Sequence, residues 1–237
     1  MKQLPSHFSE IDTSKLDAVV IGIHGFAESG KDTAGNHLIK LLGTHYHDSF
    51  ARPLREAYTA LFGRALGFTY DDVVKAEFKR QTNPLTGRTH RKELQLLGTE
   101  FYRDGTGNAD IWIQNLYLRN VDCRDFLVLT DVRFPNEAAF VRQNGILVHV
   151  NRPGHQIPGE SHASEQKLAE VPGDVILNND GTLLDFYSKI NQFFSNRLLL
   201  EGLLQWEDIR ESLEETQSTS FLMYKDALLE RGQVLQF

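Results

Sequence analysis

The strongest constraint on the fold is a glycine-rich loop between an apolar run and a helical pattern. Residues 18–23 (AVVIGI) are apolar throughout, as expected of a strand buried on both faces of a sheet. The loop GFAESGKDT follows, and residues 34–42 then repeat apolar positions at helical spacing up to Gly43. In such a unit, the loop N–H groups and the helix start point at one spot, which suits an anion. The sequence therefore predicts a phosphate-binding loop at the edge of an α/β sheet.

One residue of this loop departs from the usual pattern. The common loop has Ser or Thr directly after the Lys, where the hydroxyl holds magnesium, whereas this chain has Asp32 and then Thr33. A carboxylate is a hard oxygen ligand that Mg²⁺ accepts directly or through water. Asp32 could instead be an acid favoured by the dipole of the first helical turn. We predict that ATP binds at Gly25, Ser29, Gly30, Lys31, Asp32 and Thr33, that Lys31 is catalytic and that Asp32 contributes to a magnesium site.

The rest of the chain up to residue 194 alternates short apolar runs with helical patterns, which indicates an α/β fold with a central, mostly parallel sheet. The polar stretch 69–89 reads as a loop with a turn at Asn83–Pro84. Expected strands cover 45–50, 126–131, 146–150 and 174–177, and expected helices cover 53–66, 91–102, 111–119, 135–144 and 184–194.

Composition excludes several classes of protein. The formal net charge of −7 argues against bulk binding to nucleic acid or to an anionic membrane, but allows a local basic pocket. The single cysteine, Cys123, rules out an intrachain disulfide and fits a cytoplasmic location. We see no long apolar run that would suggest a transmembrane helix. We therefore expect small phosphorylated ligands as partners, without stable nucleic acid or membrane binding.

Two charged residues follow the strand at 126–131. Ligands of open α/β sheets collect at the carboxyl ends of the strands, where Asp131 stands. Asp131 could orient magnesium through water, or it could cap the helix that starts near Pro135. Arg133, two residues further on, could bridge two phosphates. We predict catalytic roles for both, with Asp131 also on the metal side.

The acceptor of a transferred phosphoryl group can be inferred from the charges near the second strand. A phosphate monoester has a second pKa of about 6 and is mostly a dianion at neutral pH, so it needs no strong base. An alcohol acceptor usually needs a carboxylate base. Arg52 fits a phosphate acceptor better, although Asp48 keeps an alcohol acceptor open. The region between the second and third strands is rich in cations: Arg52, Arg55, Lys79, Arg80, Arg88, Arg91 and Arg103.

The sequence GKDT at residues 30–33 resembles the loop of phage deoxynucleoside monophosphate kinases, a branch of the P-loop kinases. Four further stretches resemble that family in the same order, and together with the loop they span about residues 19–194. They are RKELQLLGTE at 91–100, TDVRF at 130–134, VNRPG at 150–154 and VILNNDG at 175–181.

The resemblance implies a P-loop kinase three-layer sandwich for residues 1–197. Within it, a helical acceptor-binding insertion is expected at about 51–122 and a lid loop at about 151–166. Residues 198–237 fall outside the resemblance. They carry an apolar stripe at helical spacing and are expected to form a helical extension, packed on the core or on a second subunit of a homodimer.

The resemblance also assigns site residues. Arg91 and Arg103 are expected to bind the acceptor nucleotide with Arg52 and Arg133, and Gln95 and Glu100 are candidate polar contacts. Arg152 is expected to bring a cation from the lid to the transition state. Asn179 and Gly181 either cradle the adenine of ATP or form an ordinary polar turn.

The function implied is phosphorylation of deoxynucleoside 5′-monophosphates to diphosphates, with ATP and Mg²⁺, for DNA precursor synthesis. If the gene is carried by a phage, the enzyme would work in the host cytoplasm. One alternative is a P-loop kinase for another small metabolite, similar to dephospho-coenzyme A kinase. Another is a non-catalytic nucleotide-binding regulator, which would not need arginines opposite the loop.

Overall fold

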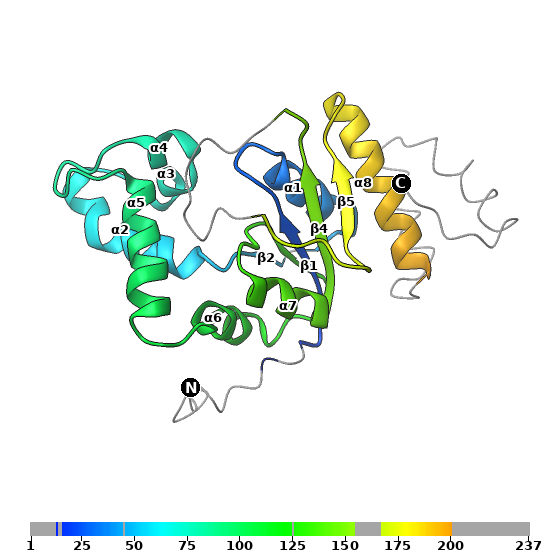
Figure 1. The fold of residues 1–237 in the computed structure, drawn as a ribbon, viewed down its shortest axis with the longest axis horizontal. Helices are drawn as coiled ribbons and strands as arrows, with labels where there is room; N and C mark the ends of the chain where they lie inside the picture. The colour runs from blue at the N-terminus through cyan, green and yellow to red at the C-terminus, as the bar shows by residue number, and fades with distance from the viewer. Residues whose placement is uncertain (1–12, 14–15, 45, 125, 155–166, 201–237) are drawn as a thin grey trace, which may run out of the picture.

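The computed structural model describes residues 13, 16–44, 46–124, 126–154 and 167–200. Its centre is a five-stranded sheet in the order β2-β3-β1-β4-β5 (Figure 1). Each neighbouring pair of strands is parallel, as the alternating sequence pattern predicts. The strands are β1 Val19–His24, β2 His47–Asp48, β3 Phe126–Leu129, β4 Gly145–Asn151 and β5 Val175–Asn178.

Strand β1 lies in the middle of the sheet, and this position puts the phosphate loop at its centre. Ile21 of β1 pairs with Val128 of β3 on one side and with Ile146 of β4 on the other. All three side chains are almost completely buried. A parallel sheet with such apolar strands needs a helical layer on both faces.

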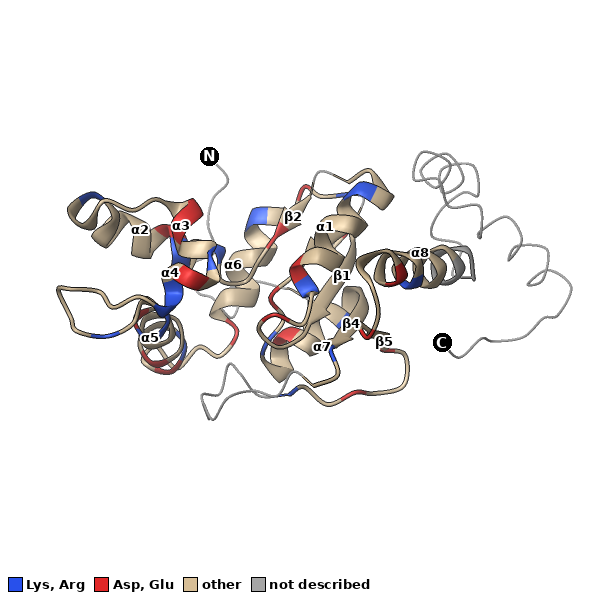
Figure 2. Cartoon of the chain, turned by 90° about the horizontal axis from the view of Figure 1, so that it is seen from above, with Lys and Arg blue, Asp and Glu red and all other residues tan. Residues whose placement is uncertain are grey.

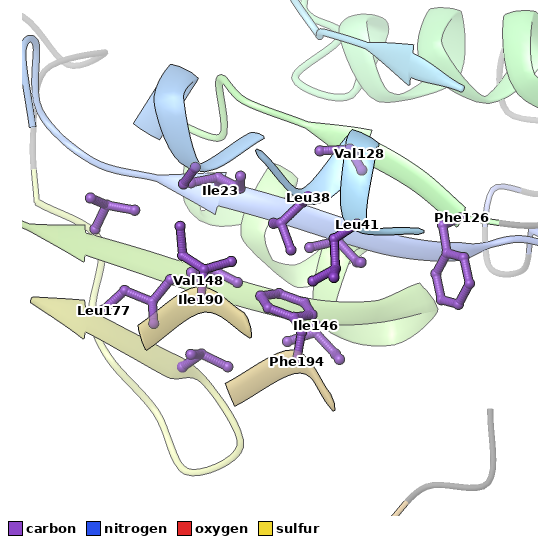
Figure 3. Close-up of a cluster of buried hydrophobic side chains, with 14 of the residues drawn as sticks. Ile23, Leu38, Leu41, Phe126, Val128, Ile146, Val148, Leu177, Ile190 and Phe194 are labelled. Carbon is purple, nitrogen blue, oxygen red and sulfur yellow. The ribbon is translucent and has the colours of Figure 1, made fainter. Parts of the chain in front are cut away.

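Two helices cover each face of the sheet. On one face, α1 (Lys31–Leu42) and α8 (Leu183–Leu200) contribute Leu38, Ile190 and Phe194 to a cluster with the strands (Figure 3). On the other face lie α6 (Ile111–Asn120) and α7 (Pro135–Asn144), which bury Leu116 and Val141 against the strands. The predicted three-layer α/β sandwich is therefore confirmed.

A helical lobe stands beside the sheet, at the left of Figure 1. It has a small core of its own around Tyr58, Phe68 and Leu94. Inside that core, Asn83 Nδ2 donates to Tyr58 Oη at 3.1 Å, and the hydroxyl is 2.7 Å from His90 Nδ1. The lobe comprises α2 Arg52–Leu66, α3 Tyr70–Val74, α4 Ala76–Arg80, α5 His90–Gln95 and the π-helix η2 Leu96–Asp104.

The structure differs from the sequence prediction in three places. The expected loop at 69–89 contains α3 and α4, each only five residues long and too short for a recognisable apolar period. The expected strand at 45–50 pairs with its neighbour only through His47–Asp48. The helix expected at 91–102 begins as α5 and widens into η2, a change of helix type that residue spacing does not reveal.

The predicted C-terminal boundary lies inside a helix. Helix α8 continues to Leu200, past the expected boundary at 197/198. Most of the predicted lid (155–166) and nearly all of the predicted extension (201–237) lie outside the described residues. Within the described part of the chain, no helix is both long and apolar enough to cross a membrane.

Candidate active site

The phosphate loop connects β1 to α1. Asn179, the residue that follows β5, contacts the backbone of this loop. Gly30, the N-cap of α1, has a φ of 103°, a left-handed conformation that favours glycine. A Cβ at Gly30 would also lie 2.6 Å from Nδ2 of Asn179. That amide donates to the backbone oxygen of Ser29 at 2.9 Å. Asn179, expected near adenine, is thus placed against the loop backbone, where it fixes the loop's shape.

Gly25 permits a second close approach in the same loop. A Cβ there would lie 2.5 Å from Ser29 Oγ and 2.9 Å from the backbone oxygen of Val150. The hydroxyl of Ser29 is buried, and no hydrogen-bond partner for it is found among the described residues. An orphaned donor beneath a loop of this shape fits a site built to receive phosphate oxygens.

Lys31 and Asp32 stand at the start of α1 and both line a cavity. Lys31 is directed inward, with only 15% of its side chain exposed, whereas the Asp32 side chain is 73% exposed. Lys31 Nζ lies 3.5 Å from Asp32 Oδ2. An exposed carboxylate beside a phosphate site fits the way proteins bind Mg²⁺, through one or two carboxylates together with substrate phosphates. No preformed group of three acidic, His or Cys side chains is found in the described ranges.

Asp131 ties the end of β3 to the start of the helical lobe. Its side chain is 5% exposed. Oδ1 accepts a hydrogen bond from Phe50 N at 2.9 Å, and Oδ2 accepts one from Ala51 N at 3.0 Å. Arg55 Nη2 lies 3.3 Å from Oδ2. Asp131 therefore orients the turn that leads into α2, and both oxygens are engaged before any metal is bound.

Glu137 was not identified from the sequence. It is 4% exposed, and one of its oxygens accepts N–H bonds from Arg133 (2.7 Å) and Phe134 (3.0 Å). Burial raises the pKa of Glu137 to about 7, although the hydrogen bond from Arg133 opposes this shift. Its place three residues after the helix N-cap Phe134 is the sequence signal that could have identified it. A Glu at that position commonly accepts a hydrogen bond from the N-cap N–H. Glu137 thereby shapes the turn that carries Arg133.

The cavity lies between the phosphate loop, the helical lobe and the β3–α7 connection, and has a volume of about 310 Å³. Its lining holds six cations and four carboxylates and is therefore basic on balance, although the chain carries a net charge of −7. Arg55 and Lys79 contribute to it, and the sequence placed them only within a generally basic region. Figure 2 shows basic positions on α4 and α5, the neighbouring short helices of the lobe. The lining cations are Lys31, Arg55, Lys79, Arg80, Arg91 and Arg133.

Of the residues predicted for the acceptor, Arg91, Gln95 and Arg133 line the cavity. Nε2 of Gln95 is buried and has no partner among the described residues. Trp112 also lines the cavity and donates from Nε1 to the backbone oxygen of Gly98 at 3.0 Å. An aromatic ring, apolar walls and an unpaired amide form a surface suited to a nucleobase.

Three other predicted acceptor residues lie outside the cavity lining. Arg52 Nε contacts Glu56 at 3.0 Å, and Glu100 contacts Lys92 at 3.4 Å. The Arg103 guanidinium stacks 3.9 Å above the ring of Phe134. In this structure all three have partners within the protein.

Arg152, at the start of the predicted lid, reaches the phosphate loop. Its Nη1 donates to the backbone oxygen of Glu28 at 3.1 Å. Glu28 has a positive φ of 65° and forms an ion pair with Arg80 of the helical lobe. Gly181, by contrast, lies at the turn before α8, where a Cβ would be 2.8 Å from Asp185 Oδ2. Neither Gly181 nor Thr33 lines the cavity.

His24, the last residue of β1, is another residue that sequence reasoning missed. Its Nδ1 lies 2.9 Å from the backbone oxygen of Val132, and Leu168 N lies 3.3 Å from Nε2. These contacts require a proton on Nδ1 and a lone pair on Nε2. Burial lowers the pKa of His24, which favours this neutral form. His24 thus joins the phosphate loop to the Asp131–Phe134 segment and to the chain returning from the predicted lid.

Comparisons with known proteins agree with this geometry. The family model for deoxynucleotide monophosphate kinase matches residues 68–190. A putative deoxynucleotide monophosphate kinase of Acanthamoeba polyphaga mimivirus is 33% identical, over 73% of this chain and 94% of its own length. The deoxynucleotide monophosphate kinases of Escherichia phage RB69 and Enterobacteria phage T4 are 29% and 32% identical, over 53% and 42% of this chain and 54% and 43% of their own lengths.

Among solved structures, an unliganded sugar kinase from Janibacter sp. HTCC2649 covers 75% of this chain and 94% of its own. Its identity is 11% and its TM-score 0.35, too low to carry an argument. The sequence matches are sufficient by themselves, because the family model covers more than half of the chain and includes most of the cavity-lining helices. The chain belongs to the deoxynucleotide monophosphate kinase family and is a phosphotransferase.

Proposed function

We propose that the chain transfers the γ-phosphoryl group of ATP to the 5′-phosphate of deoxynucleoside monophosphates, giving ADP and a deoxynucleoside diphosphate. The observation that carries this proposal is one cavity shared by the phosphate loop and cations of the helical lobe. Lys31 lines it from the loop side, and Arg55 and Arg91 line it from the lobe. Phosphoryl transfer needs two phosphates held in line and their charge neutralised, and cations on both sides of one cavity support this proposal.

On the donor side, the loop N–H groups and the start of α1 hold the phosphates of ATP, and Lys31 binds the β- and γ-phosphates. Asp32 would hold Mg²⁺, which supplies neutralisation of phosphate charge when bound, and Asp131 would contribute through water because its own oxygens already accept N–H bonds. Arg152 stabilises the charge on the transferred group. Asn179 and Gly181 border the adenine while Asn179 keeps its bond to the loop.

On the acceptor side, every described carboxylate that lines the cavity already has a partner, which favours a phosphate over an alcohol. Asp48, the candidate base for an alcohol, accepts from Asn120 at 2.8 Å and from Arg119 at 3.1 Å, and does not line the cavity. The two buried carboxylates that do line it, Asp131 and Glu137, are bonded to backbone N–H groups. A phosphate dianion attacks without a base, so it suits this cavity.

Arg91 and Arg133 hold the acceptor phosphate, because guanidinium groups bind phosphate in a bidentate manner. Gln95 offers its unpaired amide to the base. The predicted contacts of Arg52, Glu100 and Arg103 require these side chains to exchange their present partners for the nucleotide.

The net charge of −7 and the grouping of six cations around one cavity favour small nucleotides over nucleic acid as partners. We propose a cytoplasmic enzyme that supplies DNA precursors, acting in the host cell if it is encoded by a phage. Pairing of two copies through residues 198–237 stays a prediction.

The test is a substrate panel with the full chain, ATP and Mg²⁺, read by chromatographic separation of nucleotides. We expect ADP and a deoxynucleoside diphosphate in equal amounts for at least one of the common deoxynucleoside monophosphates. Dephospho-coenzyme A and sugars form the second arm of the panel. Product only in that arm would favour an alcohol kinase, and no acceptor-dependent product in either arm would favour a regulator.

A further inference from the structure

Lys79, on α4, has an unusual position for a lysine. It lines the cavity, and its Nζ donates to the backbone oxygen of Val74 at 3.0 Å. Within the described part of the chain, none of the ion pairs joins Lys79 to a carboxylate, whereas Lys75 on the same lobe pairs with Asp72 at 2.9 Å. The amino group of Lys79 is thus turned back onto the protein beside a basic cavity.

The charges that act most strongly on Lys79 come from four other parts of the chain and are positive. They are Arg55 of α2, Arg91 of α5, Lys31 of α1 and Arg133 of the β3–α7 connection. Burial, and then these four cations, lower the pKa of Lys79 to about 7.

The carboxylates lining the same cavity already have partners. Glu28 pairs with Arg80, Asp32 with Lys31 and Asp131 with Arg55. Glu137 accepts two backbone N–H bonds. None of them therefore supplies Lys79 with a counter-charge. An incoming phosphate dianion would do so, and it would also screen the four cations from one another.

We propose that Lys79 binds the acceptor phosphate and that its amino group takes up a proton from solvent when the monophosphate enters the cavity. This proposal rests on the proposed function and deepens it. The neutral amine becomes an ammonium that donates to phosphate oxygens, and no bond in the nucleotide changes. Since pH 8 lies above this pKa of about 7, most of the free enzyme carries neutral Lys79, and binding should take up about one proton.

The experiment is isothermal titration of the full chain with dTMP and the other common deoxynucleoside monophosphates at pH 8, without ATP. Each titration is repeated in two buffers with different ionisation enthalpies, and the difference in heat gives the number of protons taken up. The monophosphate is already a dianion at pH 8 and contributes almost nothing. We expect an uptake of about one proton for the wild type and about zero for Lys79→Arg, whose guanidinium stays charged.

Two further variants test whether Lys79, rather than another titratable group, takes up the proton. Lys92→Arg changes an exposed lysine that pairs with Glu100 and lies outside the cavity lining, so its proton uptake should match the wild type. Glu137→Gln removes the other group in the cavity with a pKa of about 7 and should also retain the uptake. Uptake that survives in Lys79→Arg but is lost in Glu137→Gln would overturn the proposal.

A second readout is the KM for the monophosphate between pH 7 and 9. It should rise up to about tenfold per pH unit in the wild type and stay flat in Lys79→Arg. Lys79→Met should raise KM at every pH without a slope, and circular dichroism melts check that each variant is folded. If a monophosphate binds and reacts without proton uptake, the proposed role of Lys79 is refuted but the proposed function is not. Failure of every monophosphate to bind or react would refute the proposed function as well.

Discussion

Replacing Asp131 by Asn should destabilise the protein by about 3 kcal/mol, because the side chain would lose its charge and one of its acceptor oxygens. The carboxylate accepts from Phe50 N and Ala51 N and pairs with Arg55. The new side-chain amide has two possible orientations. The less costly one puts its Nδ2 against Phe50 N and keeps its oxygen toward Ala51 N and Arg55.

The magnitude follows from these contacts. One buried N–H group is left facing another donor, at a cost of about 1–3 kcal/mol. The largely buried Arg55, 15% exposed, also loses its carboxylate partner, which adds about 1–2 kcal/mol after allowance for the remaining neutral hydrogen bond. Together these give about 3 kcal/mol.

The assay is urea unfolding followed by circular dichroism, with the slope of the transition compared between variants. Glu56→Gln is the matched control, because Glu56 is an exposed acid of α2 paired with Arg52, and its loss should cost less than about 1 kcal/mol. An unchanged free energy of unfolding in Asp131→Asn, together with a raised magnesium requirement, would refute our reasoning and make Asp131 chiefly a metal ligand.

Three further predictions concern Lys31 and Asp32 of the phosphate loop and Glu137 at the turn that carries Arg133. Lys31→Ala should lower turnover about 100-fold or more with an unchanged circular dichroism spectrum, and normal turnover would remove the loop lysine from catalysis. Asp32→Ala should raise the Mg²⁺ concentration needed for half-maximal activity, whereas an unchanged titration would leave Asp32 as a helix-start acid. The pKa of Glu137 is raised from 4.5 to about 7, so the folded state binds its proton more tightly and stability should fall as pH rises from 4.5 to 7. Urea unfolding at both pH values should show this fall reduced in Glu137→Gln by up to about 3 kcal/mol, and an identical pH dependence would contradict it.

Much of the fold was predictable because its signals are local. The apolar run before Gly25, the glycine spacing and the helical period after it belong to one short stretch of chain. The same holds for Asp131, which a residue-by-residue reading places at the end of a buried strand. The short helices α3 and α4 were missed because five residues are too few to show an apolar period.

The sequence by itself determined the type of architecture and the place of the phosphate loop, since strand burial and helix periodicity depend on near neighbours. Only the tertiary structure decided the environment of each charge. Asp131 meets Phe50 across 81 residues of sequence, and His24 meets Leu168 across 144. Burial of Lys79 and then cations from four separate segments lower its pKa, and both depend on the tertiary structure rather than on any local pattern. Such contacts depend on how the lobe and sheet come together, and neighbouring residues in the chain do not encode them.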